Sequence, residues 1–389
     1  MSRPDVCIVA PYPPDGARHS GPSGVASYTA NLAHSLAARG ASVHVVAPIE
    51  PEADGTAHDG AVVVERAFSR GPLALRAAAH AALASDARVV HVQHEHFLFG
   101  GPSSIPALLP ALDHLRRHGK GPVVTMHQVV DPSTVDRSYT SLHRVRVPAP
   151  LARHGLARLQ RTISRRAAAC VVHERSFADT IPGAVVIPHG VEERSPIAAA
   201  EARARLGLDD RFVALCFGFV APYKGLELAL DASALTAPFV QLVIAGGEHP
   251  RLAGRDSYAS ELASAHPQVT FTGHVPDEQV ELWFRAADVA LLLHPRPHGS
   301  SGALALAIAH RTPMLVSPGM AACTGAPAAL VAPADPVALA RALDALAQQP
   351  RELALLRDAV DDLAAPRSWS TVADEHLALY KEVQACPAL

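Results

Sequence analysis

Short runs of apolar residues alternate with longer segments of helical periodicity along this chain. Runs of this kind, separated by helices, are typical of parallel sheets that helices cover on both faces. One helix is predicted over residues 24–39 and two more over residues 336–363. The predicted strands are residues 6–10, 42–47, 62–64, 89–93, 123–126, 169–172, 184–187, 213–218, 240–245, 269–273, 289–293, 314–317 and 329–331.

The alternation restarts midway and divides the chain into two predicted domains. A chain of 389 residues is too long for one ordinary domain. Proline, glycine and acidic residues gather in residues 188–196, so we predict one domain over residues 1–190 and another over residues 191–368. Doubly wound domains bind ligands beyond the carboxyl ends of their strands. The sequence therefore predicts an α/β protein whose site lies in a cleft that both domains face.

Composition and charge exclude several classes of function. The residues are 49% apolar and the net charge is -3, which allows a sizeable core and gives no sign of nucleic-acid binding. No signal peptide or membrane-spanning apolar stretch is apparent, so we expect a soluble, cytoplasmic protein. The cysteines are scattered, and Cys7, Cys170 and Cys216 lie in apolar runs where burial is expected.

A glycine-rich loop follows the first predicted strand. Gly21 and Gly24 precede a helix from Val25; glycine lets the backbone approach a ligand, and a helix N-terminus favours an anion. A flexible loop that needs turns would have the same composition. The dinucleotide pattern Gly-x-Gly-x-x-Gly does not occur here, which argues against a dehydrogenase.

Histidines gather near the ends of two predicted strands. His94, Glu95 and His96 follow the fourth strand. These are metal-ligand types, but no second cluster of ligands accompanies them, so we expect no metal and assign the three residues to acceptor binding. His127 ends the fifth strand, where such folds keep their sites. A structural histidine held by hydrogen bonds is the alternative for His127.

Two loops in the second half are suited to bind a diphosphate. Lys224, one of three lysines in an arginine-rich chain, lies in FGFVAPYKG at residues 217–225, where its ammonium could neutralise a leaving diphosphate. HGSSGALAL at residues 298–306 opens a helix whose first amides can hold hydroxyl or phosphate oxygens, although a plain helix cap is the alternative. Asp-x-Asp does not occur, so we expect metal-independent chemistry.

The order of these motifs resembles the family 4 retaining glycosyltransferases of the GT-B fold. The likeness covers almost the whole chain and is strongest from about residue 212 to residue 331. It includes the strand end at Gly218, Lys-Gly at 224–225 and FTGHVP at 271–276. In the first half, His127 fits the histidine of a Thr-x-His strand end. The closing segment is similar to the family's last helix, so we expect residues 369–389 to return to the first domain.

The resemblance implies a set of roles for named residues. It implies two Rossmann-like domains, the first facing the acceptor and the second binding the nucleotide-sugar. His127 and Lys224 would be catalytic, and Gly21, His94, Glu95 and His96 would contact the acceptor. The residues assigned to the donor are Gly24, Gly218, Lys224, Gly247, His298, Gly299, Ser300, Ser301, Gly302 and Ala303.

The chain departs from the family pattern at three positions. Phe219 stands where the family usually has an arginine. His298 and Leu306 stand where it has a pair of glutamates, the second of which ordinarily holds the donor ribose. Leu306 cannot do so. A Ser-Gly-x-Leu version of this loop is similar to a branch of the family, so an active enzyme is still expected.

We therefore expect a metal-independent, hexosyltransferase-type enzyme without a cofactor. It would move a sugar from a nucleotide-sugar co-substrate, a UDP-sugar by preference, to a hydroxyl of a small or saccharide acceptor in secondary-metabolite or polysaccharide biosynthesis. The alternatives are a nucleotide-sugar epimerase or hydrolase and a non-catalytic binding protein. Residues 137–166 hold eight arginines and no acidic residue. Such a helix can lie on an anionic membrane and serve a lipid-linked acceptor, although a packed helix with a solvated basic side is the favoured interpretation.

Overall fold

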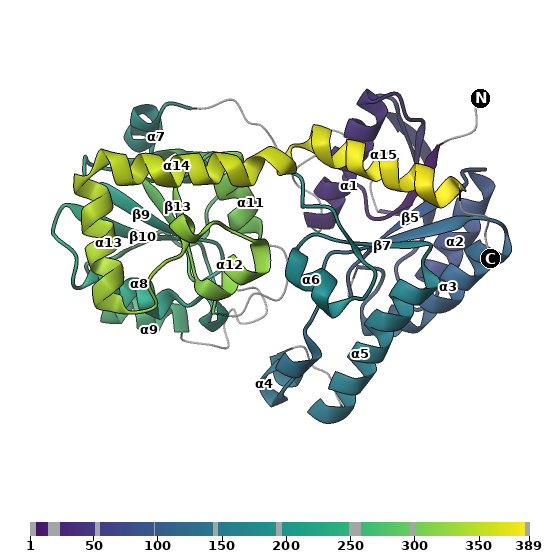
Figure 1. The fold of residues 1–389 in the computed structure, drawn as a ribbon, viewed down its shortest axis with the longest axis horizontal. Helices are drawn as coiled ribbons and strands as arrows, with labels where there is room; N and C mark the ends of the chain where they lie inside the picture. The colour runs from purple at the N-terminus through teal and green to yellow at the C-terminus, as the bar shows by residue number, and fades with distance from the viewer. Residues whose placement is uncertain are drawn as a thin grey trace. The chain divides into compact units, whose positions relative to one another are not determined.

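The computed structural model describes residues 5–14, 24–50, 55–96, 98–142, 147–191, 197–248, 258–295 and 301–385. These residues form two compact units. The first consists of residues 5–190 together with 369–385, and the second lies within residues 191–368. Figure 1 shows the elements of both units.

The first unit is built on an eight-stranded sheet of order β3-β4-β2-β1-β5-β6-β7-β8. Every neighbouring pair is parallel except β3 and β4. The strands are β1 (Val6–Val9), β2 (Val43–Pro48), β3 (Gly55–Asp59), β4 (Val62–Phe68), β5 (Val89–His94), β6 (Gly121–Met126), β7 (Ala169–Val172) and β8 (Val185–Val186). The helices are α1 (Gly24–Ala38), α2 (Ala74–Ala84), α3 (Ile105–Arg117), α4 (Arg137–Leu142), α5 (Ala149–Arg166), α6 (Arg175–Thr180) and α15 (Trp369–Ala385).

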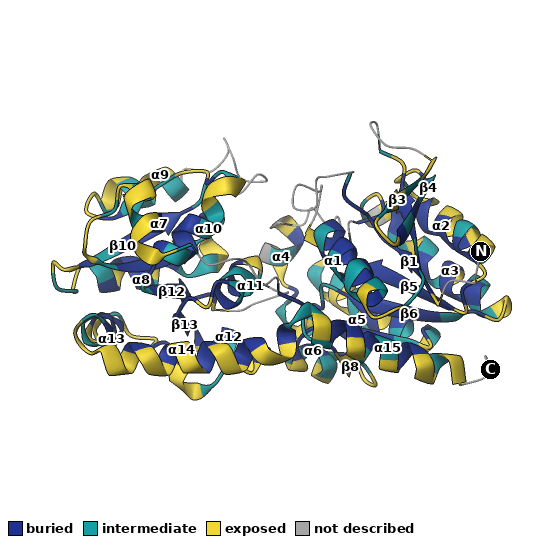
Figure 2. Ribbon diagram, turned by 90° about the horizontal axis from the view of Figure 1, so that it is seen from above, coloured by how far each residue is buried: buried dark blue, intermediate teal, exposed yellow. Residues whose placement is uncertain are grey.

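Burial explains why the central strands form where the apolar runs predict. Every residue of β1 and β5 is buried, as expected for strands that helices cover on both faces. Figure 2 shows these strands in the colour of buried residues. The helix α15 joins this core through Val372, Leu379 and Tyr380, and it lies beside α1.

The second unit is built on a five-stranded parallel sheet of order β11-β10-β9-β12-β13. Its strands are β9 (Phe212–Phe217), β10 (Val240–Ala245), β11 (Thr270–Phe271), β12 (Val289–Leu292) and β13 (Met314–Val316). Its helices are α7 (Ala199–Leu206), α8 (Leu226–Ser233), α9 (Tyr258–Ala265), α10 (Asp277–Ala286), α11 (Gly302–Ala309), α12 (Pro318–Thr324), α13 (Pro336–Gln348) and α14 (Pro350–Ala364). A second hydrophobic core lies between this sheet and its helices.

Two details differ from the sequence prediction. Residues 329–331 are not a strand: Ala328–Leu330 form a 3₁₀ turn, and only Val331 makes a single bridge, to Val316. Strand β3 was not predicted, because its residues GTAHD are polar and mostly exposed. It forms as the antiparallel edge of a hairpin with β4, so the first sheet is not wholly parallel.

Candidate functional site

The chain order of the second sheet creates a switch point beside β9. From β9 the chain continues to β10 on one side, and β12 pairs with the other side of β9. Ligands in doubly wound sheets bind outside the carboxyl ends of the strands at such a point. Gly218 directly follows β9, and His294 lies just after β12. Lys224 lies in the short 3₁₀ turn Pro222–Lys224 that leads from β9 to α8.

Glycines allow the backbones to approach one another at this switch point. A Cβ atom at Gly246 would lie 2.0 Å from the carbonyl oxygen of Gly218. A Cβ atom at Gly225, whose φ is +67°, would lie 2.4 Å from the carbonyl oxygen of Leu293. Side chains at either position would force the carboxyl ends of β9, β10 and β12 apart. The glycines therefore allow the turn that carries Lys224 to lie close to the sheet.

Lys224 places its ammonium directly beside Gly218. Its Nζ atom lies 3.1 Å from the position that a Cβ atom of Gly218 would occupy, and 5.8 Å from the centre of the Tyr223 ring. Burial lowers the pKa of Lys224 from its usual value of 10.5. Among the described residues, no carboxylate forms an ion pair with this ammonium. A half-buried cation of this kind is suited to an anionic ligand.

His294 faces the same region, and the sequence analysis did not single it out. Its ring lies 6.3 Å from that of Tyr223. Burial, and then the nearby charge of Lys224, lower its pKa to about 3, so it is neutral. Its Nδ1 atom is buried without a hydrogen-bond partner among the described residues. In the sequence, the position of His294 just after the apolar run of β12 could have identified it as a candidate site residue.

The helix α11 begins near the predicted donor loop. Ser301 caps it by accepting a hydrogen bond of 3.3 Å from the backbone N–H of Leu304. This is the arrangement of a plain helix cap, while Gly302 remains exposed and Ala303 is buried. The other predicted donor residues of this loop, His298, Gly299 and Ser300, lie outside the described residues.

The remaining donor positions of this unit differ in exposure. Gly247 lies against the backbone of His274: a Cβ atom at Gly247 would be 3.3 Å from the backbone nitrogen of His274. Phe219, which replaces the arginine usual in the family, is 43% exposed. Leu306 is half-buried and packs against the core of the second unit.

In the first unit, four histidines lie at or just beyond the carboxyl ends of four neighbouring strands. His94 ends β5, His127 follows β6 and His173 follows β7, while His189 lies just beyond β8. Tyr28 of α1 lies among three of them, with ring centroids 4.7 Å from His127, 5.1 Å from His173 and 4.9 Å from His189. The sequence analysis identified His94 and His127 but not the other two.

His127 has both ring nitrogens in hydrogen bonds. Its Nε2 atom lies 2.7 Å from the Gln93 side-chain amide, and its Nδ1 atom lies 3.2 Å from Nε2 of His173. Burial, reinforced by His173 and other nearby histidines, lowers its pKa well below 6.5. His127 is therefore held by hydrogen bonds, as the structural alternative expects. It also lies at the carboxyl ends of the strands, where doubly wound sheets in general bind their ligands.

Three of the four predicted acceptor residues, His94, Glu95 and His96, lie at the end of β5. The rings of His94 and His96 are 5.6 Å apart, and Nδ1 of His96 lies 3.2 Å from Oε1 of Gln128. Burial lowers the pKa of His94 to about 3. Glu95 is half-buried between them in sequence, and the strand ends before it.

The predicted glycine loop is described only at its end. Gly24 is the first residue of α1, and a Cβ atom there would meet nothing within 4 Å. Gly21 lies outside the described residues. Among the described residues, nothing in the packing at Gly24 requires glycine.

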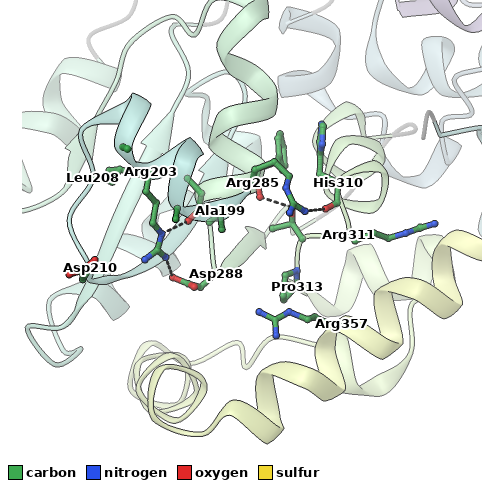
Figure 3. A pocket seen from close by; sticks show the side chains of 16 residues that line it. Ala199, Arg203, Leu208, Asp210, Arg285, Asp288, His310, Arg311, Pro313 and Arg357 are labelled. Atoms are coloured by element: carbon green, nitrogen blue, oxygen red, sulfur yellow. Dashed lines mark hydrogen bonds and ion pairs between the residues drawn. The ribbon is translucent and has the colours of Figure 1, made fainter. Parts of the chain in front are cut away.

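A hollow of about 690 Å³ lies elsewhere in the second unit (Figure 3). It is at the amino ends of the strands, because Asp288 precedes β12 and Pro313 precedes β13. Arg203 pairs with Asp288, and Arg285 donates to the carbonyl oxygens of Ile197, at 2.7 Å, and His310, at 3.1 Å. Arg203 and Arg285 thus serve the fold, and the hollow is distinct from the switch point.

The described residues offer neither a metal-binding cluster nor a membrane-spanning helix. They hold no cluster of three or more histidine, cysteine, aspartate or glutamate side chains that could bind a metal ion. No helix among them has the length and apolar character needed to cross a bilayer.

Comparison with known protein families identifies the family of this chain. Residues 22–194 match the model of Glycosyltransferase Family 4, and residues 211–349 match that of Glycosyl transferases group 1. The chain belongs to this glycosyltransferase family. The family predicted from the order of the motifs is confirmed. Among curated proteins, no sequence matches this glycosyltransferase.

Solved structures resemble the glycosyltransferase over nearly its whole length. Sucrose-phosphate synthase from Thermosynechococcus elongatus has a TM-score of 0.72 at 19% identity and covers 98% of this chain and 99% of its own. HepE from Anabaena, in complex with UDP and glucose, has a TM-score of 0.65 at 15% identity and covers 97% and 100%. WaaG, a glycosyltransferase of lipopolysaccharide biosynthesis, has a TM-score of 0.60 at 15% identity and covers 96% and 99%. These likenesses confirm the predicted GT-B fold.

Proposed function

We propose that this glycosyltransferase moves a hexosyl group from a UDP-sugar to a hydroxyl of a small or saccharide acceptor, with retention and without a metal. The observation that carries the proposal is Lys224, a half-buried ammonium beside Gly218 at the switch point of the second sheet. The complex of the similar protein HepE with UDP supports a uridine nucleotide as the leaving group.

The second unit would supply the electrostatic part of the reaction. As the bond between the anomeric carbon and the diphosphate oxygen breaks, negative charge grows on the diphosphate, and Lys224 would stabilise it. The backbone amides at the start of α11 would add weaker contacts, together with Ser300 and its neighbours. Because Leu306 cannot bind the ribose, another group must do so.

The first unit would orient the sugar of the donor and the acceptor. The acceptor hydroxyl attacks the anomeric carbon from the face that the diphosphate leaves, and its proton passes to the departing diphosphate oxygen. No protein nucleophile takes part. His127 would hold the donor sugar, and His94, Glu95 and His96 would contact the acceptor.

The function is tested by ligand binding and by the fate of the donor. In a thermal-shift screen, UDP should raise the melting temperature more than GDP, dTDP or ADP, because a tighter ligand stabilises the folded state more. UDP-glucose should then be consumed much faster with an acceptor than without one, giving an α-linked product by NMR, and EDTA should not slow it. Donor consumption that yields free sugar at the same rate without an acceptor would instead identify a hydrolase or epimerase.

A second candidate is transfer to a lipid-linked acceptor at a membrane surface. On α5, Arg158, Arg161 and Arg165 are exposed, and Leu151 is 65% exposed. Among the described residues, only Arg166 of this helix pairs with a carboxylate, that of Asp113. A basic face with an exposed leucine is suited to anionic lipids.

Packing of α5 favours the first candidate over this one. Gln160 is buried and bonds both the N–H and the carbonyl oxygen of Val130, at 3.0 Å each, and Ile163 is buried beside it. Co-sedimentation with phosphatidylserine vesicles tests the alternative. Binding that Arg158→Gln with Arg165→Gln abolishes, but Arg351→Gln on α14 does not, would favour the membrane function.

A further inference from the structure

The hydrogen bonds around His127 determine where its proton lies. Nδ1 of His173 lies 3.0 Å from the carbonyl oxygen of Ile187. A carbonyl oxygen only accepts, so Nδ1 of His173 carries the hydrogen. The other nitrogen of a neutral His173 then accepts, and it faces Nδ1 of His127 at 3.2 Å. Nδ1 of His127 is therefore the donor, and a neutral ring leaves its Nε2 as an acceptor.

Gln93 completes this arrangement from the neighbouring strand β5. Its side-chain amide, at Oε1, lies 2.7 Å from Nε2 of His127. Since that nitrogen has no hydrogen, the NH₂ end of the amide must face it, and the two ends of an amide are assigned by their hydrogen bonds. The carbonyl end then faces His91, whose Nε2 atom lies 3.4 Å from the other end of the amide. His91 is itself held by Thr125 at 2.7 Å and Tyr380 at 2.6 Å.

The surroundings of His127 favour a neutral ring. Among the described residues, the titratable groups near it are Tyr28 from α1, His91 and His94 from β5, and His173 and His189 from the ends of β7 and β8. None of these groups is a carboxylate that could stabilise an imidazolium. Gln93 is fully buried and His173 is 1% exposed. The edge of the Tyr28 ring, at an interplanar angle of 85°, restricts the imidazole further.

We propose that Gln93 and His173 are positioning residues, which hold His127 in one orientation as the neutral Nδ1–H tautomer. This inference rests on the proposed function and deepens it. His127 then serves as a hydrogen-bond acceptor: a hydroxyl of the donor sugar takes the place of the Gln93 amide at Nε2 and donates its hydrogen. The ring has no proton to give at that atom, so it does not act as a general acid.

The first test reads the tautomer without any substrate. The protein labelled with ¹⁵N-histidine is measured by NMR at neutral pH, and the His127→Ala variant assigns the His127 signals. Nδ1 should be protonated and Nε2 unprotonated. His173→Leu should give a mixture of tautomers, and Gln93→Glu, which can only accept, should move the proton to Nε2. A protonated Nε2 in the wild-type protein would overturn the inference.

The second test compares turnover in the same variants. Removing the partner that orients a metal-bound histidine costs about 10–100-fold, and we expect a loss of that order for His173→Leu. His173→Gln should restore most of it, because an amide can donate to Ile187 and accept from His127. His80→Gln, an exposed histidine of α2, is the control for a lost imidazole. Equal losses in His173→Leu and His173→Gln, with both folded, would refute the positioning role.

The two arms separate the inference from the proposed function. If the tautomer is as described but His127→Ala transfers sugar normally, the role of His127 in the proposed function is wrong. If His127→Ala is inactive but the wild-type ring carries its hydrogen on Nε2, the proposed function stands and this inference falls. Circular dichroism and melting temperature confirm that each variant is folded before it is scored.

Discussion

Replacing Lys224 by methionine should remove most of the charge stabilisation of the leaving diphosphate. Methionine keeps a stem of similar length beside Gly218 but carries no charge. Two unit charges about 4 Å apart interact by about 4 kcal/mol at an effective dielectric constant of about 20. Part of this energy is already present when the donor binds, and only the increase during bond breaking affects the rate. Loss of one such donor typically lowers turnover ~10²–10³-fold, and we expect that range for Lys224→Met.

The assay is steady-state UDP release with saturating acceptor. Lys381→Met, which removes an exposed lysine of α15, is the matched control and should retain turnover. The buried ammonium is disfavoured in the folded state, as its lowered pKa indicates. Lys224→Met should therefore not lower the free energy of unfolding at neutral pH, and urea denaturation checks this.

The lowered pKa of Lys224 also predicts how the activity depends on pH. The ammonium loses its proton below the usual pH for lysine, so donor affinity should fall as pH rises through that pKa. Lys224→Arg stays charged, so its donor affinity should not fall over the same range, although its planar group should restore turnover only in part. Near-normal turnover in Lys224→Met would show that the diphosphate does not bind at this loop.

Three further predictions follow from the packing and the titration of the two units. Gly246→Ala should lower the melting temperature and weaken UDP binding, because its Cβ atom would lie 2.0 Å from a carbonyl oxygen. The control is Gly207→Ala, where a Cβ atom meets open space, so backbone strain should lower the free energy of unfolding by only about 1 kcal/mol. Since the pKa of His94 is lowered to about 3, its contribution to stability is complete above pH 6.5 and decreases as the pH falls below that value. Between pH 6.5 and 5, urea denaturation should therefore show that His94→Asn loses less free energy of unfolding than the wild-type protein does. Gly190→Ala should displace the indole of Trp369, now 2.5 Å from the Cβ position, and shift its fluorescence to longer wavelength. An unchanged spectrum would contradict that packing.

The fold could be predicted from the sequence wherever burial decides the structure. The strands β1, β7 and β10 lie within one residue of the predicted ranges, because their apolar runs are buried on both faces. The edge strand β3 escaped prediction since its polar residues are ordered by pairing with β4, which no local pattern reports. Conversely, the apolar run at residues 329–331 forms no strand: only Leu330 is buried, and it lies in a 3₁₀ turn.

The site was predictable only where a single loop carries it. Lys224 and Gly218 are six residues apart, so their neighbourhood can be inferred from one strand end and the turn after it. His173 and His189 join His127 through the order of strands in the sheet, and that order cannot be read from local spacing. The roles assigned to all of these residues, and to the two predicted domains, stay predictions.

In the proposed function, the carboxyl ends of the strands differ in charge between the two sheets, and this difference matches the diphosphate and the sugar of the donor. The switch point of the second unit holds a cation without a carboxylate partner among the described residues, which suits a diphosphate. In the first unit, burial lowers the pKa values of His94 and His127, so both are uncharged at neutral pH. A neutral imidazole bonds a hydroxyl without attracting anions. An imidazolium there would compete with Lys224 for the diphosphate, whereas a neutral His127 leaves the diphosphate to Lys224.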